Sequence, residues 1–436
     1  MVVKPLLPGA HALRGREAML EEAVGLAHAI GLHVVQSCAA PVKTPSASHL
    51  MGKGWVDRIG AMATEHAAAL VVIDHALSPI QQRNLERDWK TKVIDRTGLI
   101  LEIFGARARS REGQLQVELA ALTYQRSRLV RSWTHLERQR GGFGFLGGPG
   151  ESQLEIDRRL IDQRMLKIKE ELEDVRRTRG LQRRARRRAE LPVTALVGYT
   201  NAGKTTLFNR LTDAGALAEN MLFATLDTTM RGMKLPGGRE IIVSDTVGFI
   251  ADLPAQLIEA FRATLEEVQE ADVILHVRDI AHPDAAAQQH DVEQVLGTLG
   301  IQGDDPRLIE VLNKIDLLPE ETQNFLAQES ARHTADAMLA GGAGLADVKH
   351  HGRGGTAAVS ALSGAGIDVL LRRIEAVIGA AEQVVKVEIP LADGATLAWI
   401  YAHGRIIERR DGTDAAALEV ALSAADLGRF RQRFLR

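Results

Sequence analysis

A glycine-bounded loop in the middle of the chain has residue types that suit phosphate binding. Residues 198–205 follow the pattern G-x-x-x-x-G-K-[ST]. In such a loop the backbone N–H groups and the start of the next helix point at phosphate oxygens. Lys204 would bridge the β- and γ-phosphates of a nucleotide, and the Thr205 hydroxyl would bind Mg²⁺. Such a string arises by chance in roughly one chain in a hundred of this length, so the prediction needs further motifs.

A second motif, D-x-x-G, spans residues 245–248 and follows an apolar run that reads as a buried strand. Its Asp245 carboxylate can hold Mg²⁺ through water. The backbone N–H of Gly248 can meet the γ-phosphate. From these two motifs we predict Lys204 and Gly248 as the catalytic residues.

Two later motifs suit the base of the nucleotide. N-K-x-D, at residues 313–316, ends an apolar run, and the Asp316 carboxylate can accept from the ring N–H and the exocyclic amino group of guanine. Adenine lacks this pair of donors, so Asp316 selects GTP over ATP. Ser360, Ala361 and Leu362 end another apolar run, and a backbone N–H there can bond the guanine oxygen. Each motif alone could be a strand-end turn with a helix cap, but in this order the four predict a GTPase.

The residue after D-x-x-G bears on the mechanism. Many GTPases place a glutamine there to orient the attacking water. This chain has Phe249, whose ring cannot hydrogen-bond water. Either another group positions the water or a partner reshapes the loop, and unassisted turnover is expected to be on the order of 10⁻³ s⁻¹ or below.

The elements that position these motifs predict several domains, and 436 residues leave room for about three. We place an α/β P-loop GTPase domain at residues 191–382. Residues 1–108 alternate strand-like and helix-like runs, which predicts a small α/β domain with a parallel sheet. Its predicted helices cover residues 17–30, 56–66 and 78–89, and its predicted strands cover residues 32–36, 69–73 and 92–95. Gly52, Lys53 and Gly54 precede the second helix, where they either touch a phosphate or form a flexible turn.

Residues 109–190 predict a helical coiled-coil hairpin with a Gly-rich tip loop, because apolar residues recur at threes and fours on two long segments. The loop, residues 141–150, has six glycines and an apolar tip. It suits insertion into a partner or packing against its own helices. Arginines crowd residues 176–188 and indicate contact with RNA phosphates. Residues 383–436 predict a small C-terminal α+β domain.

Composition narrows the remaining classes of protein. The net charge is −2, so no global field selects nucleic acid and such contacts must come from local patches. The single cysteine, Cys38, excludes an internal disulfide and suits a reducing compartment. No apolar run approaches the length of a membrane span. We therefore expect a cytoplasmic protein with no membrane span, and we take it to be monomeric.

Two stretches of the predicted hairpin, residues 128–142 and 148–159, resemble the signature of HflX-family GTPases. The phosphate loop and residues 222–227 and 245–249 resemble the same family. The resemblance implies a protein that binds the large ribosomal subunit and its RNA. It implies that the GTP form splits or rescues stalled ribosomes, as part of a stress response, and that the glycine-rich tip approaches the peptidyl transferase region.

Similarity to the family also favours Thr225 as an Mg²⁺ ligand beside Thr205 and Asp245, with Thr229 as the alternative. The predicted nucleotide contacts are Gly198, Tyr199, Thr200, Asn201, Ala202, Gly203, Lys204, Thr205, Thr206, Phe223, Ala224, Thr225, Asp245, Thr246, Val247, Gly248, Asn313, Lys314, Asp316, Ser360, Ala361 and Leu362. The alternative hypothesis is an RNA-binding or remodelling module, also able to bind ATP, whose GTP site is mainly structural. In that case loss of GTP binding would leave effects on RNA intact.

Overall fold

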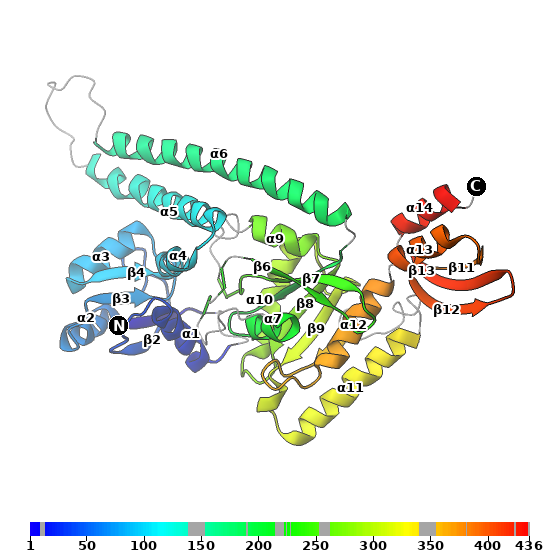
Figure 1. The fold of residues 1–436 in the computed structure, drawn as a ribbon. Helices are drawn as coiled ribbons and strands as arrows, with labels where there is room; N and C mark the ends of the chain where they lie inside the picture. The colour runs from blue at the N-terminus through cyan, green and yellow to red at the C-terminus, as the bar shows by residue number, and fades with distance from the viewer. Residues whose placement is uncertain are drawn as a thin grey trace.

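The computed structural model describes residues 1–8, 14–137, 153–188, 191–213, 222–223, 225–226, 228–252, 262–339, 355–380, 382–422 and 424–434. Figure 1 shows an N-terminal α/β part, a long helical hairpin, a central α/β part and a small C-terminal part. The hairpin runs along one side of the two α/β parts. Parallel strands dominate the two larger sheets, and this confirms the predicted α/β class.

The N-terminal part is a four-stranded parallel sheet with helices on both faces. Its strands are β1 (Val2–Leu6), β2 (Ser37–Pro41), β3 (Leu70–Ile73) and β4 (Lys92–Asp95), in the order β2-β1-β3-β4. Its helices are α1 (Arg16–His28), α2 (Lys53–Glu65), α3 (Pro79–Trp89) and α4 (Arg96–Arg107). Ile59 of α2 and Leu85 of α3 pack on one face, while Leu26 of α1 and Ile103 of α4 pack on the other.

Capping residues mark the starts of two of these helices. The Ser78 hydroxyl accepts from the Gln81 N–H at 3.2 Å and the Gln81 side chain accepts from the Ser78 N–H at 2.9 Å, which confirms the predicted start of α3. Asp95 caps α4 by accepting from the Gly98 N–H at 2.8 Å. The sequence pattern does not predict α4, because its middle is buried almost throughout and lacks an amphipathic period.

The strand predicted at residues 32–36 is wrong. Gly31 follows α1 with a φ of +73°, and the Leu32 N–H bonds back to the Ala27 carbonyl at 3.2 Å. This turn keeps Leu32 and Val34 packed against the cluster beneath α1. The chain enters the sheet only at Ser37, the first residue of β2.

The predicted hairpin consists of α5 (Arg111–Glu137) and α6 (Gln153–Arg188), which lie side by side in Figure 1. Ion pairs join the two helices, with Arg164 Nε 2.6 Å from Glu118 and Arg126 Nε 2.6 Å from Asp162. The glycine-rich tip loop lies outside the described residues, so its predicted insertion into a partner stays a prediction.

The central part is a six-stranded sheet in the order β10-β9-β8-β5-β7-β6, with only β6 antiparallel to its neighbour. Its strands are β5 (Val193–Gly198), β6 (Thr229–Lys234), β7 (Glu240–Asp245), β8 (Val273–Asp279), β9 (Leu308–Asn313) and β10 (Thr356–Ala358). Its helices are α7 (Lys204–Thr212), α9 (Arg262–Gln269), α10 (Ala285–Thr298), η1 (Ile315–Leu317), α11 (Glu320–Leu339) and α12 (Ile367–Ala380). The predicted motifs follow the carboxyl ends of β5, β7, β9 and β10, so the parallel strands bring all four to one edge.

The C-terminal part is the predicted small α+β unit. It consists of β11 (Gln383–Pro390), α13 (Gly394–His403), β12 (Arg405–Asp411), β13 (Ala415–Leu422) and α14 (Ala424–Phe434). The antiparallel sheet has the order β11-β13-β12, and Leu418 and Val420 pack with Ile400 and Phe430 beneath it. In the part of the chain that the structure describes, no helix is long and apolar enough to cross a membrane.

Candidate functional site

The phosphate loop connects β5 to α7 and needs glycine at both ends. Gly198 has a φ of +151°, and a Cβ there would lie 2.2 Å from the Val277 carbonyl oxygen. Gly203 has a φ of +91°, and a Cβ there would lie 2.3 Å from Asn313 Nδ2. A larger residue at Gly198 would clash with the backbone of β8, and one at Gly203 would displace the Asn313 side chain. The close approach of three strands therefore shapes the loop.

Lys204, the first residue of α7, is buried inside this loop. Its Nζ donates to the carbonyl oxygens of Gly198 at 3.1 Å and Tyr199 at 2.7 Å. Burial lowers the pKa of the Lys204 ammonium to about 8, and the Asp245 carboxylate opposes this shift. A Cβ on Gly248 would lie 3.0 Å from the same Nζ, so the D-x-x-G loop and the phosphate loop meet at this ammonium group.

Three oxygen-bearing side chains converge beside Lys204. The Thr205 hydroxyl lies 2.8 Å from the Thr225 hydroxyl and donates to Asp245 Oδ2 at 2.8 Å. The Thr225 hydroxyl donates to the same Oδ2 at 3.1 Å. Asp245 Oδ1 is buried and has no hydrogen-bond partner among the described residues. Two hydroxyls and a carboxylate are hard oxygen ligands, so this set fits Mg²⁺.

The two threonines considered for the metal lie in different places. Thr225 reaches the carboxylate of Asp245 through its side chain. Thr229 is the first residue of β6 and is paired with Asp245 in the sheet register. Ala224, another predicted nucleotide contact, lies outside the described residues. Burial raises the pKa of Asp245, although the Lys204 charge and the two hydroxyls lower it, so a divalent cation here would favour the carboxylate form.

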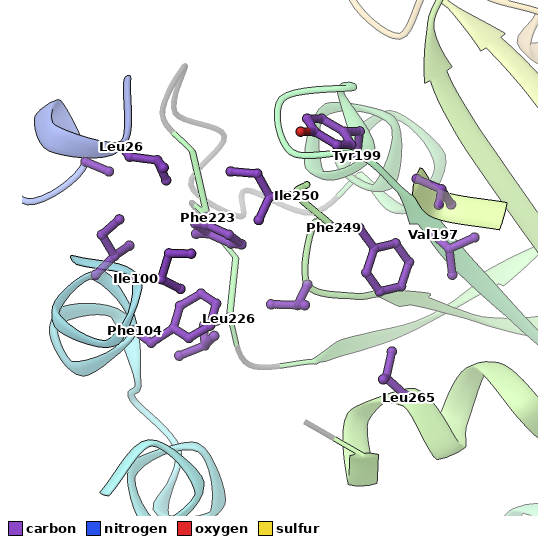
Figure 2. Close-up of a cluster of buried hydrophobic side chains, with 14 of the residues drawn as sticks. Leu26, Ile100, Phe104, Val197, Tyr199, Phe223, Leu226, Phe249, Ile250 and Leu265 are labelled. Atoms are coloured by element: carbon purple, nitrogen blue, oxygen red, sulfur yellow. The ribbon is translucent and has the colours of Figure 1, made fainter. Parts of the chain in front are cut away.

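The D-x-x-G loop is bonded directly to the phosphate loop. The Thr200 N–H donates to the Phe249 carbonyl at 2.7 Å, and the Phe249 N–H donates to the Gly198 carbonyl at 3.0 Å. The Thr246 hydroxyl donates to the Leu196 carbonyl at 2.6 Å. Figure 2 shows the Phe249 ring pointing into the apolar interior, and Val247 is buried in the same cluster. Phe249 therefore anchors this loop and does not orient water.

The motifs predicted to bind the base meet at Asn313. Its Nδ2 donates to the Ala202 carbonyl at 2.8 Å, and its Oδ1 accepts from the Ala361 N–H at 3.0 Å. Asn313 thus joins the phosphate loop to the segment after β10. The neighbouring Asp316 and Leu362 are exposed at the edge, where a purine ring could reach them.

Sequence reasoning missed the side chains that support these motifs. Asp279 Oδ2 accepts from Lys314 Nζ at 2.7 Å, and Arg210 donates to the carbonyls of Ala361 at 3.2 Å and Leu362. The Ser360 hydroxyl is buried and accepts from the Ser363 N–H at 3.1 Å. Asp279 and Arg210 lie far away in sequence and belong to no motif, whereas the Ser360–Ser363 contact is local.

The remaining predicted contacts divide by the direction of their side chains. Asn201 and Thr206 lie on the loop and the first turn of α7, and the buried Thr200 hydroxyl has no hydrogen-bond partner among the described residues. The side chains of Tyr199 and Phe223 instead pack in the cluster that includes residues of α1 and α4. Any contact that these two make with a nucleotide must come from their backbone.

Known relatives decide the family. The chain is 48% identical to the GTPase HflX of Magnetococcus marinus over 415 residues, which cover 95% of this chain and 90% of that protein. The chain belongs to the HflX family of GTPases. It is also 47% identical to the GTPase HflX of Escherichia coli over 301 residues, which cover 69% of this chain and 70% of that protein.

Four family models match along this HflX-family chain. Their descriptions are GTP-binding GTPase N-terminal at residues 17–105, GTP-binding GTPase Middle Region at 107–186, 50S ribosome-binding GTPase at 193–314 and HflX C-terminal domain at 346–434. The chain is therefore a GTP hydrolase with a GTPase domain of the ribosome-binding class. A solved GTP-binding protein of Sulfolobus solfataricus with GDP is 22% identical and covers 87% of this chain and 99% of its own, with a TM-score of 0.44.

Proposed function

We propose that this chain is a Mg²⁺-dependent GTPase that binds the large ribosomal subunit in its GTP form and acts as a splitting or rescue factor. The observation that carries the proposal is the approach of Thr225 to Thr205 and Asp245. Thr225 belongs to a segment outside the phosphate loop, so a metal and triphosphate at this point would order that segment. Ordering of a segment by GTP is how a GTPase changes its affinity for a partner.

Each group at the site has a part in hydrolysis. Lys204 binds the β- and γ-phosphates, and the Gly248 N–H bonds the γ-phosphate. Thr205, Thr225 and Asp245 hold Mg²⁺, which offsets the charge of the phosphate oxygens when bound. The backbone N–H groups of residues 198–206 wrap the phosphates, and those of the D-x-x-G loop face the transferred group.

The base end selects the nucleotide. The Asp316 carboxylate accepts from the two guanine donors. Lys314 lies beside the base, and the Asp279 carboxylate holds its ammonium group in place. Asn313 and the segment of Ser360, Ala361 and Leu362 close the pocket from the other side. ATP offers no matching donors and would leave the carboxylate unpaired.

The ribosome supplies what the isolated site lacks. The Phe249 side chain is buried and cannot orient the attacking water. The free chain therefore hydrolyses GTP slowly, and the ribosome-bound chain hydrolyses it faster. Support for the ribosome as partner comes from the family model for residues 193–314 and from exposed cations on α6, among them Arg158, Arg176 and Arg177. We place the active monomer in the cytoplasm, with domains at residues 1–108, 109–190, 191–382 and 383–436.

The test measures steady-state GTP hydrolysis with and without purified large subunits, for the wild type and Asp316→Asn. Subunits should stimulate the wild type strongly. The variant should lose about a hundredfold in kcat/KM for GTP and recover turnover with xanthosine triphosphate, whose 2-carbonyl accepts from the new amide.

Stimulation of the variant should then appear only with xanthosine triphosphate, which ties the ribosome effect to this site. The wild type with xanthosine triphosphate is the control and should remain slow. If large subunits leave wild-type GTP turnover unchanged, the switch is wrong and the RNA-module hypothesis takes its place.

A further inference from the structure

One apolar cluster crosses the boundary between the N-terminal part and the GTPase part. From the GTPase part it includes Phe223 and Leu226, which flank Thr225, together with Val247, Phe249 and Ile250 of the D-x-x-G loop. From the N-terminal part it includes residues of α1 and α4. Figure 2 shows Phe223 between these helices and the GTPase loops. The two segments that would respond to GTP therefore share a core with another domain.

Phe223 is held in a conformation that it would not adopt alone. Its φ is +58°, in the left-handed region that costs a non-glycine residue free energy. Its side chain is 2% exposed and meets the Phe104 ring edge to face, with centroids 4.7 Å apart at 84°. Packing on Phe104 of α4 offsets the backbone cost. Phe223 lies two residues before Thr225, so its packing against Phe104 helps set the position of the Thr225 hydroxyl.

Leu222, the residue before Phe223, packs closely against α1. A Cβ on Gly25 would lie 3.2 Å from Leu222 Cδ1, so a side chain of any size at Gly25 would press on Leu222. Leu26, the next residue of α1, is fully buried in the shared cluster. The two helices therefore form a shaped seat for Leu222 and Phe223.

Polar contacts hold the D-x-x-G loop against the N-terminal part. The Tyr199 hydroxyl accepts from the Ala251 N–H at 2.9 Å and donates to Glu22 Oε2 at 2.5 Å. Arg96 of α4 donates to the Ala251 carbonyl at 2.8 Å and to Glu22 Oε1 at 2.9 Å. Ala251 lies three residues after Gly248, so α1 and α4 hold the loop that would contact the γ-phosphate.

We propose that Phe104 and Arg96 are positioning residues for GTP, through which the N-terminal part holds both nucleotide-sensing segments in place. The proposal rests on the proposed function in one respect, since it takes Thr225 as a ligand of the Mg²⁺ that accompanies GTP. GDP has no γ-phosphate for these segments to meet. Docking of the N-terminal part is therefore coupled to GTP and not to GDP, and by reciprocity GTP tightens that docking.

The test measures the affinity of the full chain for a non-hydrolysable GTP analogue and for GDP, both with Mg²⁺ and without ribosomes. Phe104→Ala should lower the affinity for the GTP analogue by about tenfold, which is the usual size of coupling between linked sites. The affinity for GDP should change by no more than about twofold. Leu85→Ala is the matched control, because Leu85 is as deeply buried but packs on the opposite face of the N-terminal sheet. It should leave the ratio of the two affinities unchanged.

A pair of further variants keeps the test decisive. Phe223→Ala combined with Phe104→Ala should weaken the analogue no more than either change alone, because both remove one contact. If Phe104→Ala does not fold, Phe104→Leu keeps most of the volume and should show about a threefold loss of the same selectivity. Equal losses for analogue and GDP, or a changed ratio in Leu85→Ala, would overturn the proposal.

The outcome is separable from that of the ribosome assay. Ribosomes are absent here, so unchanged selectivity in Phe104→Ala would refute the coupling and leave ribosome stimulation standing. A lost selectivity without any stimulation by large subunits would retain the coupling and refute the proposed partner.

Discussion

The two larger sheets of this chain, built mainly from parallel strands, both carry charged side chains at the carboxyl ends of their strands, but they use them differently. At the N-terminal sheet the charges pair internally: Lys4 Nζ lies 2.6 Å from Asp74, Arg96 lies 2.5 Å from the same carboxylate, and Arg128 lies 2.7 Å from Asp95. At the GTPase sheet, Asp245 Oδ1 has no hydrogen-bond partner among the described residues. The charges of the first edge are paired with one another, although the buried Nε atoms of Arg96 and Arg128 have no hydrogen-bond partner among the described residues. At the second edge, a carboxylate oxygen beside two hydroxyl groups is left open for a ligand.

By this comparison, cavity size alone is a poor guide to the proposed nucleotide site. A cavity of about 790 Å³ lies over the N-terminal edge and is lined in part by Arg14, Arg96 and Arg128, and by Ala251 of the GTPase part. These arginines already face carboxylates, so an anion that entered would have to compete with an internal partner. An unpaired carboxylate oxygen beside two hydroxyl groups is the better guide to a metal and phosphate site.

The largest expected effect comes from removing the cation of the open edge. Lys204→Ala should lower kcat/KM for GTP by about a thousandfold, since a preorganised donor to the transferred phosphoryl group is lost. Lys4→Ala is the counterpart at the N-terminal edge, and it should destabilise that part while lowering GTP turnover far less than Lys204→Ala does. Steady-state kinetics of the two variants checks this, and a comparable loss of turnover in Lys4→Ala would erase the distinction between the edges.

The next effect concerns the self-paired edge. Asp74→Asn leaves Lys4 and Arg96 without their shared carboxylate, and we expect the free energy of unfolding of the N-terminal part to fall by about 3 kcal/mol. Asp368→Asn is the control, because its exposed pair with Arg372 should contribute at most about 0.5 kcal/mol. Hydrogen exchange in urea measures both, read in β3 and β4 for Asp74→Asn and in α12 for Asp368→Asn. Similar effects of the two changes would show that burial of the charges is unimportant.

The same carboxylate predicts a pH dependence. Burial raises the pKa of Asp74, but the charges and hydrogen bonds of Arg96 and Lys4 outweigh it, so the pKa lies below its ordinary value of 3.8. A carboxylate with a lowered pKa stabilises the fold fully above its unfolded-state pKa and loses that contribution as pH falls through its folded-state pKa. The contribution of Asp74 to wild-type stability should therefore be lost progressively as pH falls below about 4, and Asp74→Asn should lack this part of the loss. Parallel pH curves for both proteins would contradict it.

The sequence predicted what is local. The phosphate loop, the end of β7 and the Ser78 cap depend on residues close together in the chain, and the structure has each where its pattern indicates. The strand at residues 32–36 and the unpredicted α4 are failures of the same rule, because a long-range core holds one segment off the sheet and buries the other on most sides. Hydrophobic periodicity cannot detect either effect.

The partners of the site were beyond sequence reasoning for a related reason. Tyr199 reads as one variable position of the phosphate loop, yet its hydroxyl meets Glu22, 177 residues away. Arg96 reads as a surface arginine after a strand, yet it is buried and bonds Ala251. Neither type nor spacing encodes these contacts, since they arise only when two domains pack together.

The smallest expected effect tests whether a small change in the N-terminal part alters nucleotide binding by the GTPase part. Gly25→Ala adds a methyl group inside α1, which should stabilise the helix by about 0.5–1 kcal/mol. The same methyl group would lie 3.2 Å from Leu222 Cδ1, so it should displace the segment before Thr225 and weaken a GTP analogue by about threefold, with GDP unchanged.

Gly105→Ala in α4 is the matched control for this change, because apart from its chain neighbours and the backbone of its own helix nothing lies within 4 Å of its Cβ position. It should stabilise its helix similarly and leave both affinities unchanged. Thermal unfolding and equilibrium binding on the two variants separate helix stability from nucleotide selectivity. A loss of GTP affinity in a variant with a more stable helix cannot come from general destabilisation, so it would assign the effect to the contact with Leu222. Unchanged binding in Gly25→Ala would mean that Leu222 moves aside freely and that Phe223 alone couples the two parts.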